Sequence, residues 1–193
     1  GADQVEVAGS LYQARTGIVI ATGTRAAVPP IPGLADTPFW TNHEIMEAKE
    51  LPASMLVLGG GAIGAEVSQV MARFGVKVTL VEGADRLLPR NEPEAGQVLQ
   101  DVFEAEGIQV HTGQFASSVS YKDEMFTMTM PDGSELQGER LLVATGRQTF
   151  LRELGVGVLG IDPKKHFLET TGNQRVQPGI WAVGDIAGDG LFT

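Results

Sequence analysis

The chain has no cysteine among its 193 residues. That absence excludes disulfides, thiolate metal sites and a cysteine nucleophile from the chain itself. Basic residues are also scarce, with 14 Lys and Arg against 24 Asp and Glu and a formal net charge of −10. A protein that binds the phosphate backbone of nucleic acid needs clustered basic side chains. We therefore expect no nucleic-acid partner.

Long apolar runs are lacking too, and none approaches the ~20 residues that a membrane-spanning helix needs. The hydrophobic share of 42% is ordinary for a globular protein, and the length fits one or two domains with proper cores. We therefore expect a cytoplasmic protein without a membrane partner.

Two similar phrases stand far apart in the sequence, IVIATGT from Ile18 and LLVATGR from Leu141. Each pattern is typical of a buried strand that runs into a glycine turn. A proline-rich stretch at 28–33 follows the first phrase and indicates a hinge or a domain crossing. The residues between the phrases therefore decide whether the repeat has meaning.

Those residues predict a parallel sheet with strands at 55–58, 76–81, 108–111 and 141–144. The first connecting helix should end at Gly75 and bury Ile63, Val67, Val70, Met71 and Phe74. The second should begin at Asn91 as N-cap, with Pro93 in the first turn and Glu94 in the capping-box position. Its expected buried residues are Val98, Leu99, Val102 and Phe103.

After His111 the pattern changes to short strands at 115–121, 125–130 and 134–136 joined by tight turns, which predicts an antiparallel meander. We assign the apolar cluster in it to packing rather than to a thioether metal site: Met125, Phe126, Met128 and Met130. The three histidines, His43, His111 and His166, lack ligand spacing, so we predict no metal site.

A GxGxxG motif, made by Gly59, Gly61 and Gly64, follows the first parallel strand and opens a helix. The first glycine permits the tight turn, the second lets backbone N–H groups approach a pyrophosphate, and the third allows close packing of helix on strand. The helix N-terminus favours the phosphate charge. The candidate pyrophosphate contacts are Gly59, Gly60, Gly61, Ala62, Ile63 and Gly64. Glycine-rich turns also occur for steric reasons alone, so the motif indicates a dinucleotide site only together with a second feature of such sites.

Glu82, at the end of the second parallel strand, supplies that partner. An acidic side chain there can accept hydrogen bonds from the 2′-hydroxyl of an adenosine ribose, although a solvated glutamate is the plainer interpretation. The same charge repels a 2′-phosphate, which favours NAD(H) over NADP(H). Arg86 and Arg90 lie close behind and would oppose that preference.

Together with the C-terminal phrase GIWAVGDIAGDGLFT, these motifs resemble the FAD-dependent pyridine nucleotide-disulfide oxidoreductase family. The resemblance is greatest to its dihydrolipoamide dehydrogenase and mercuric reductase branches, through WTNHE and RLLPRNEPE. In that family an NAD(P) domain interrupts an FAD domain. The resemblance implies FAD-domain segments at 1–27 and 148–193 around an NAD-binding domain at 28–147. The predicted fold class is thus α/β, a Rossmann-type parallel sheet with an antiparallel meander, flanked by partial FAD-domain segments.

The resemblance also implies site residues in both parts of the chain. On the FAD side they are Thr22, Gly23, Gly184, Asp185, Leu191, Phe192 and Thr193, with the Asp185 carboxylate on the ribityl chain of the flavin. On the NAD side, Gly146 would pass the nicotinamide ribose and Ala116 would lie on the adenine side. Glu66 is a candidate near the nicotinamide, and a solvated helix glutamate is the alternative.

The sequence departs from the family in having no FAD-type GxGxxG, no redox-active cysteine pair and no C-terminal His-Glu pair, and Gln148, Thr149 and Phe150 replace the usual Arg-Pro-Asn. The first three departures predict a fragment without catalytic residues of its own, whose flanking segments pair with each other or stay partly disordered. The resemblance implies a parent that binds FAD, exchanges hydride with NAD and dimerises through a C-terminal domain absent here. A non-catalytic nucleotide-binding module and a flavin-independent Rossmann dehydrogenase remain alternatives.

Overall fold

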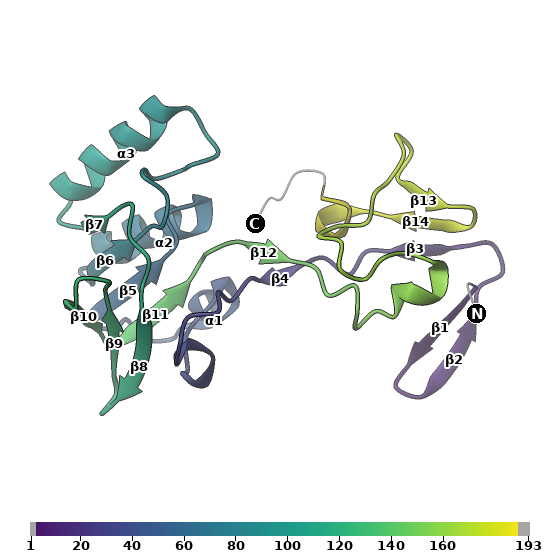
Figure 1. Cartoon of the computed structure of the whole chain (residues 1–193), viewed down its shortest axis with the longest axis horizontal. Helices are drawn as coiled ribbons and strands as arrows, with labels where there is room; N and C mark the ends of the chain where they lie inside the picture. The colour runs from purple at the N-terminus through teal and green to yellow at the C-terminus, as the bar shows by residue number, and fades with distance from the viewer. Residues whose placement is uncertain (1–2, 189–193) are drawn as a thin grey trace. The chain divides into compact units, whose positions relative to one another are not determined.

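The computed structural model describes residues 3–188, which form two compact units (Figure 1). One unit comprises the described residues 3–25 and 147–188, and the other is Ala26–Gly146. Each unit has a hydrophobic core of its own.

A four-stranded parallel sheet forms the centre of the Ala26–Gly146 unit. Its order is β11 (Arg140–Val143), β5 (Ser54–Leu58), β6 (Lys77–Val81) and β7 (Gln109–His111). All three pairings are parallel, and Met55 of β5 lies opposite Val78 of β6. The predicted strands and their neighbours are confirmed. The sheet is covered on both faces, which explains why its strands are continuous apolar runs.

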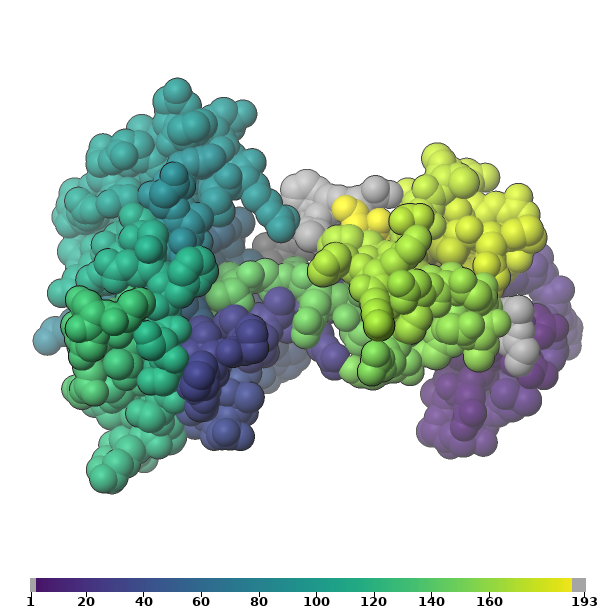
Figure 2. Space-filling model, viewed as in Figure 1, coloured from purple at the N-terminus to yellow at the C-terminus, as the bar shows by residue number. Residues whose placement is uncertain are grey.

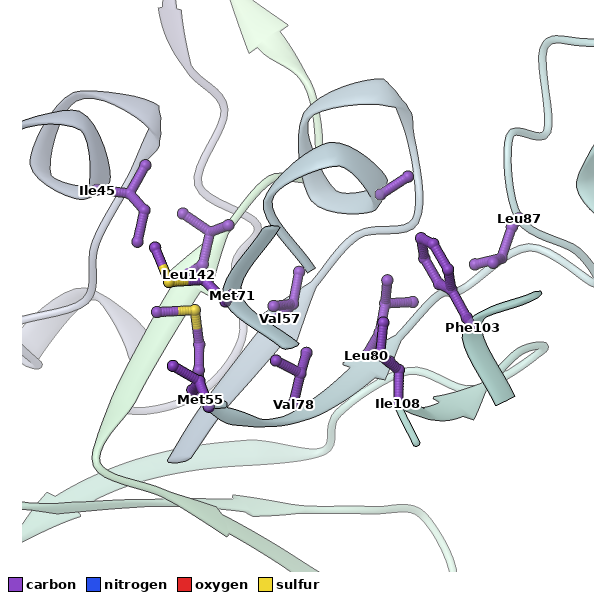
Figure 3. Packing of buried hydrophobic residues seen from close by; sticks show 12 residues of the cluster. Ile45, Met55, Val57, Met71, Val78, Leu80, Leu87, Phe103, Ile108 and Leu142 are labelled. Atoms are coloured by element: carbon purple, nitrogen blue, oxygen red, sulfur yellow. The ribbon is translucent and has the colours of Figure 1, made fainter. Parts of the chain in front are cut away.

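Helices cover one face of this sheet. They are α1 (Asn42–Glu47), α2 (Ala62–Arg73) and α3 (Pro93–Ala105). Alternate strand residues meet them in one buried cluster, labelled in Figure 3, which includes Ile45, Met55, Val57, Met71, Val78, Leu80, Leu87, Phe103, Ile108 and Leu142. α1 begins at Thr41 with the reciprocal hydrogen bonds of a capping box to Glu44.

The predicted meander covers the other face. β8 (Ser118–Lys122), β9 (Met125–Thr129) and β10 (Glu135–Gly138) form an antiparallel sheet in the order β10-β9-β8. Phe126, Met128 and Met130 are buried against the parallel sheet, so their packing role is confirmed. A short 3₁₀ turn, η1 (Leu34–Asp36), adds the buried Leu34 to the same cluster. Figure 2 shows α3 in teal and the meander in green on the surface of this unit.

The predicted buried face of α2 is wrong in part. Val70 and Phe74 are 48% and 64% exposed, whereas Gly64, Ala65, Ser68 and Met71 are buried. The reason is the close approach of the helix to the sheet, which only small residues permit. The face of α2 that contacts the sheet therefore differs from the apolar stripe expected from the sequence. The two are offset by about one residue, which is roughly 100° around the helix.

The predicted start and face of α3 are also corrected. Its N-cap is Glu92, without a side-chain cap, and not Asn91, whose N–H donates to the Leu88 carbonyl in the preceding turn. Of the four residues expected to be buried, Val98 and Val102 are exposed, whereas Leu99 and Phe103 face the protein together with Gly96. A methyl group on Gly96 would overlap the Leu87 carbonyl, so the preceding loop packs on this helix and selects its buried face.

In the other unit the two flanking segments pair with each other. β14 (Ile180–Ala182) lies parallel to β3 (Ile18–Ile20) and antiparallel to β13 (Arg175–Gln177). The core of the unit also involves η2 (Val156–Leu159) and η3 (Gly184–Ala187), and its buried residues are Leu151, Val156, Leu168, Ala182 and Ile186. Val19 is 62% exposed, so the expectation of a strand covered on both faces is wrong for β3.

Four short strands complete the fold. β1 (Gln4–Val7) and β2 (Ser10–Gln13) form an antiparallel hairpin. β4 (Arg25–Ala26) pairs with β12 (Arg147–Gln148), close to the two glycine turns of the repeated phrases.

Candidate nucleotide-binding site

The glycine turn joins the carboxyl end of β5 to α2, and its geometry requires a glycine at 59. Gly59 has φ of 110°, and a methyl group on it would overlap the backbone of Ala144. Its N–H donates to the Val81 carbonyl at 2.8 Å, which ties the turn to the end of β6. No residue with a side chain fits this position without moving the sheet.

The other two glycines of the motif have separate roles. A methyl group on Gly64 would overlap the Gly59 carbonyl oxygen, so Gly64 permits close packing of helix on strand. At Gly61, the N-cap of α2, no described atom beyond the adjoining chain lies within 4 Å of the point where a Cβ would stand. No described side chain caps this helix end. This helix end is therefore uncapped and has open space beside Gly61, and the helix dipole favours an anion there.

Glu82 follows β6 and is fixed beside this turn. One carboxylate oxygen accepts the Gly60 N–H at 2.5 Å and the other accepts the Ala84 N–H at 2.7 Å. The side chain is half-buried. An ionised carboxylate has about four acceptor sites, so two bonds leave capacity for a hydroxyl donor.

Arg86, one of the two arginines that could offset the charge of Glu82, is engaged inside its own loop. Its guanidinium donates to the Pro89 carbonyl at 3.0 Å and to the Asn91 carbonyl at 3.2 Å. The N–H of Leu88 donates to the Gly60 carbonyl at 2.9 Å, so the same loop is joined to the glycine turn. Arg90 is exposed.

The segment after β7 forms the far side of the site. The N–H of Gly113 donates to the Ala84 carbonyl at 2.6 Å, and that of Gln114 donates to the Glu82 carbonyl at 3.1 Å. Phe115 is 71% exposed, and its ring lies against Gly83. Ala116 is buried, with its methyl group in the cluster under the meander, so only its main chain is left for a ligand. The sequence pattern did not single out Phe115.

Gly146 lies beyond β11, and this strand ends at the same edge of the sheet. It has φ of 132°, and its carbonyl accepts the Ala27 N–H at 2.9 Å. The Thr145 hydroxyl donates to the Ala27 carbonyl at 2.7 Å. Glu66 is exposed one turn into α2. The structure therefore gathers the predicted NAD-side residues at the carboxyl edge of the sheet, where ligands of open α/β sheets bind.

The FAD-side candidates belong to the other unit. In η3 the Asp185 carboxylate accepts the Thr24 hydroxyl at 2.9 Å and Nε of Arg147 at 3.1 Å. The side chains of Arg147 and Asp185 are only 17% and 19% exposed. Gly23 and Gly184 have φ of 65° and 75°, and Thr22 is exposed. The predicted contacts Leu191, Phe192 and Thr193 lie outside the described residues.

Sequence reasoning missed Thr24 and Arg147 as partners of Asp185. Both adjoin the glycine of an ATG phrase, and Nε of Arg147 also donates to the Thr24 hydroxyl at 2.6 Å. The two copies of the phrase therefore meet in one hydrogen-bonded group. Their repetition was the signal that could have identified these residues.

The described residues contain no group of three His, Asp or Glu side chains able to hold a metal ion. Within residues 3–188 no helix is both long and apolar enough to cross a membrane.

Two shallow hollows of about 490 and 520 Å³ lie along β7 and around Trp40, and neither includes the glycine turn.

Comparison with known proteins identifies a matching family model and similar sequences and structures. A family model described as pyridine nucleotide-disulphide oxidoreductase matches residues 2–192. A mercuric reductase of Shewanella putrefaciens is 38% identical over 171 residues, which are 87% of this chain and 30% of that protein. A dihydrolipoyl dehydrogenase of Chlorobaculum tepidum is 38% identical over 182 residues, 91% of this chain and 38% of that protein.

Among solved structures, the HOCl-induced flavoprotein disulfide reductase RclA from Escherichia coli superposes with a TM-score of 0.90 at 28% identity. The match covers 99% of this chain and 44% of that one. The chain therefore spans between 30% and 44% of the length of these three relatives.

Proposed function

Because the chain belongs to the pyridine nucleotide-disulphide oxidoreductase family, we propose that its Ala26–Gly146 unit binds NAD(H) within a larger flavoprotein. The observation that carries the proposal is the hydrogen bond from the Gly60 N–H to the Glu82 carboxylate, 2.5 Å long. It holds the acidic group that would select the adenosine ribose directly against the turn that would bind the pyrophosphate.

The pyrophosphate would lie on the open side of Gly61, within reach of the first N–H groups of α2. No acidic residue stands in the first turn of that helix, so nothing there opposes the phosphate charge. The ribose hydroxyls would donate to the free acceptor sites of Glu82. These residues suit the adenosine and pyrophosphate parts of a dinucleotide.

In the parent protein the bound nicotinamide and flavin would supply the redox chemistry by exchanging a hydride. The role of this chain is to position the nicotinamide, with Gly146 beside its ribose and Glu66 as a candidate near its ring. On the flavin side, Thr22, Gly23, Gly184 and Asp185 are the proposed contacts. Since the Asp185 carboxylate already accepts from Thr24 and Arg147, it is held in one orientation for a ribityl hydroxyl.

NAD(H) is favoured over NADP(H) because a 2′-phosphate would lie beside the negative charge of Glu82. The Arg86 guanidinium, which could offset that charge, donates instead to two backbone carbonyls of its loop. The proposal therefore includes a preference for the cofactor without the phosphate.

Titration calorimetry of the chain with NADH and NADPH tests the proposal. The wild-type chain should bind NADH more tightly than NADPH. Glu82→Gln keeps the size of the side chain but removes its charge, so the two affinities should approach each other while that for NADH falls about tenfold, the scale for hydrogen bonds to a charged group. Glu135→Gln, at an exposed position of β10, is the matched control and should bind as the wild type does. Failure of the wild-type chain to bind either cofactor would refute the proposal.

A further inference from the structure

Phe115 differs from the aromatic side chains that build this unit. Phe103 and Phe126 are fully buried, whereas Phe115 is 71% exposed in the loop between β7 and β8. Single exposed apolar residues are common on proteins, so exposure alone carries no conclusion. The position of Phe115 beside Glu82 is what gives it a meaning.

One contact of the ring and the anchoring of both neighbouring residues fix this position. It lies against Gly83, where an added methyl carbon would stand 2.6 Å from Cζ and 2.8 Å from Cδ1 of the ring. The residue before it, Gln114, donates its N–H to the Glu82 carbonyl, and the residue after it, Ala116, is anchored in the core. The loop therefore presents a large aromatic surface to solvent beside the acidic residue of the site.

The place of an adenine ring follows from the ribose. A ribose bound to Glu82 carries the pyrophosphate on one side, toward Gly61, and the base on the other. The residues on that other side are Gly83 and Ala84 after β6 and the loop that contains Phe115. Aromatic side chains stack on nucleobases because both present π-faces.

We propose that Phe115 stacks on the adenine of NAD(H). The absence of a side chain at Gly83 leaves the room that the Phe115 ring needs to take this position. The inference rests on the proposed NAD(H) function and deepens it. Phe115 acts on affinity for the adenosine half of the cofactor alone. Gly83 has no left-handed backbone angle, so an alanine there is compatible with the main chain and would displace only the ring.

The test is calorimetry of the whole chain with NADH and with ADP-ribose, which keeps the adenosine and the pyrophosphate but has no nicotinamide. Phe115→Ala should weaken both ligands by the same factor, about tenfold. Phe115→Tyr should bind as the wild type does, and Phe115→Leu should resemble the alanine variant because it lacks a π-face. Gly83→Ala should lower the affinity for both ligands in the wild-type background and should have no further effect on either affinity in Phe115→Ala. Thermal unfolding should be unchanged in Phe115→Ala, since the side chain is mostly exposed.

The possible failures are distinguishable. If the wild-type chain binds neither NADH nor ADP-ribose, the proposed function is wrong and this inference is wrong with it. If the wild-type chain binds both ligands and Phe115→Ala binds each with the wild-type affinity, only the stacking role is overturned. An affinity retained in Phe115→Leu would also overturn it, since plain apolar contact would then suffice.

Discussion

Glu82 serves the fold as well as the candidate site. Its two carboxylate oxygens accept N–H groups from Gly60 and Ala84, on either side of the edge where a ribose would bind. A substitution that removes both acceptors would therefore loosen the glycine turn and remove a ligand contact together. For this reason the glutamine variant, which keeps one acceptor oxygen, separates the effect of charge from the effect on the turn better than alanine does.

Ser68 permits a prediction on stability. It is fully buried on α2, and its hydroxyl has no hydrogen-bond partner among the described residues. A buried hydroxyl without a partner costs about 1–3 kcal/mol, and alanine is also the better helix former. We expect Ser68→Ala to raise the free energy of unfolding of this unit by about 1 kcal/mol in urea denaturation. Ser120→Ala, at an exposed site on β8, should change it by less than about 0.5 kcal/mol. A loss of stability in Ser68→Ala would mean that the hydroxyl is engaged.

The strand–turn–helix formed by β5 and α2 permits a paired prediction. Gly61→Ala should fold normally, because space is open around the added methyl group. The same methyl group would occupy the approach to the N-terminus of α2, so the affinity for NADH should fall by at least about tenfold. Gly64→Ala should instead destabilise the unit by about 1–3 kcal/mol, because its methyl group overlaps the Gly59 carbonyl. Thermal unfolding and NADH titration on both variants check the contrast. Normal NADH binding by Gly61→Ala would place the pyrophosphate elsewhere.

The elements show which features the sequence could predict. Strand positions and the meander follow from period and turn residues, and these are confirmed for β5, β6 and β9. The helix faces did not follow, because the pattern counts large apolar residues as buried. On α2 the close approach to the sheet depends on small residues, which leaves Phe74 exposed.

The site shows a similar division between motif and context. The order of strand, glycine turn, helix and acid is enough to predict Gly59 and Glu82 at one sheet edge. The partners of Glu82 are backbone N–H groups, which no side-chain pattern encodes. Phe115 stands in a loop without periodicity, so only its place beside Glu82 and its contact with Gly83 distinguish it from other exposed aromatic residues.

The two units of the chain differ in how much of a cofactor each could hold. The GxGxxG pattern occurs twice in the sequence, at Gly59, Gly61 and Gly64 and again at Gly155, Gly157 and Gly160. Among the described residues, only the first copy joins a strand to an α-helix, and it belongs to the Ala26–Gly146 unit. The other unit has the proposed ribityl contact Asp185. In its described residues the second copy of the pattern forms the 3₁₀ turn η2, and no strand–glycine turn–α-helix is present there for the FAD pyrophosphate. Much of the binding that FAD offers is therefore unmatched in this chain by itself.

We accordingly expect the purified chain to be colourless and to bind FAD no tighter than about millimolar. An absorbance scan of the purified protein, followed by a titration with added FAD, checks this. A stoichiometric flavin band would show that the flanking segments bind the cofactor without a strand–glycine turn–α-helix of their own, contrary to the proposed division of roles.

Binding of NAD(H) in the Ala26–Gly146 unit is tested most directly by mapping backbone amide chemical shifts during an NADH titration, which a chain of 20.5 kDa permits. We predict saturable shifts at three places: the glycine turn at 59–64, the end of β6 at 82–84 and the loop at 113–116. Amides of the described residues 147–188 should stay largely unchanged. Shifts confined to 147–188, or no shifts at any of the three places, would contradict NAD(H) binding at this sheet edge.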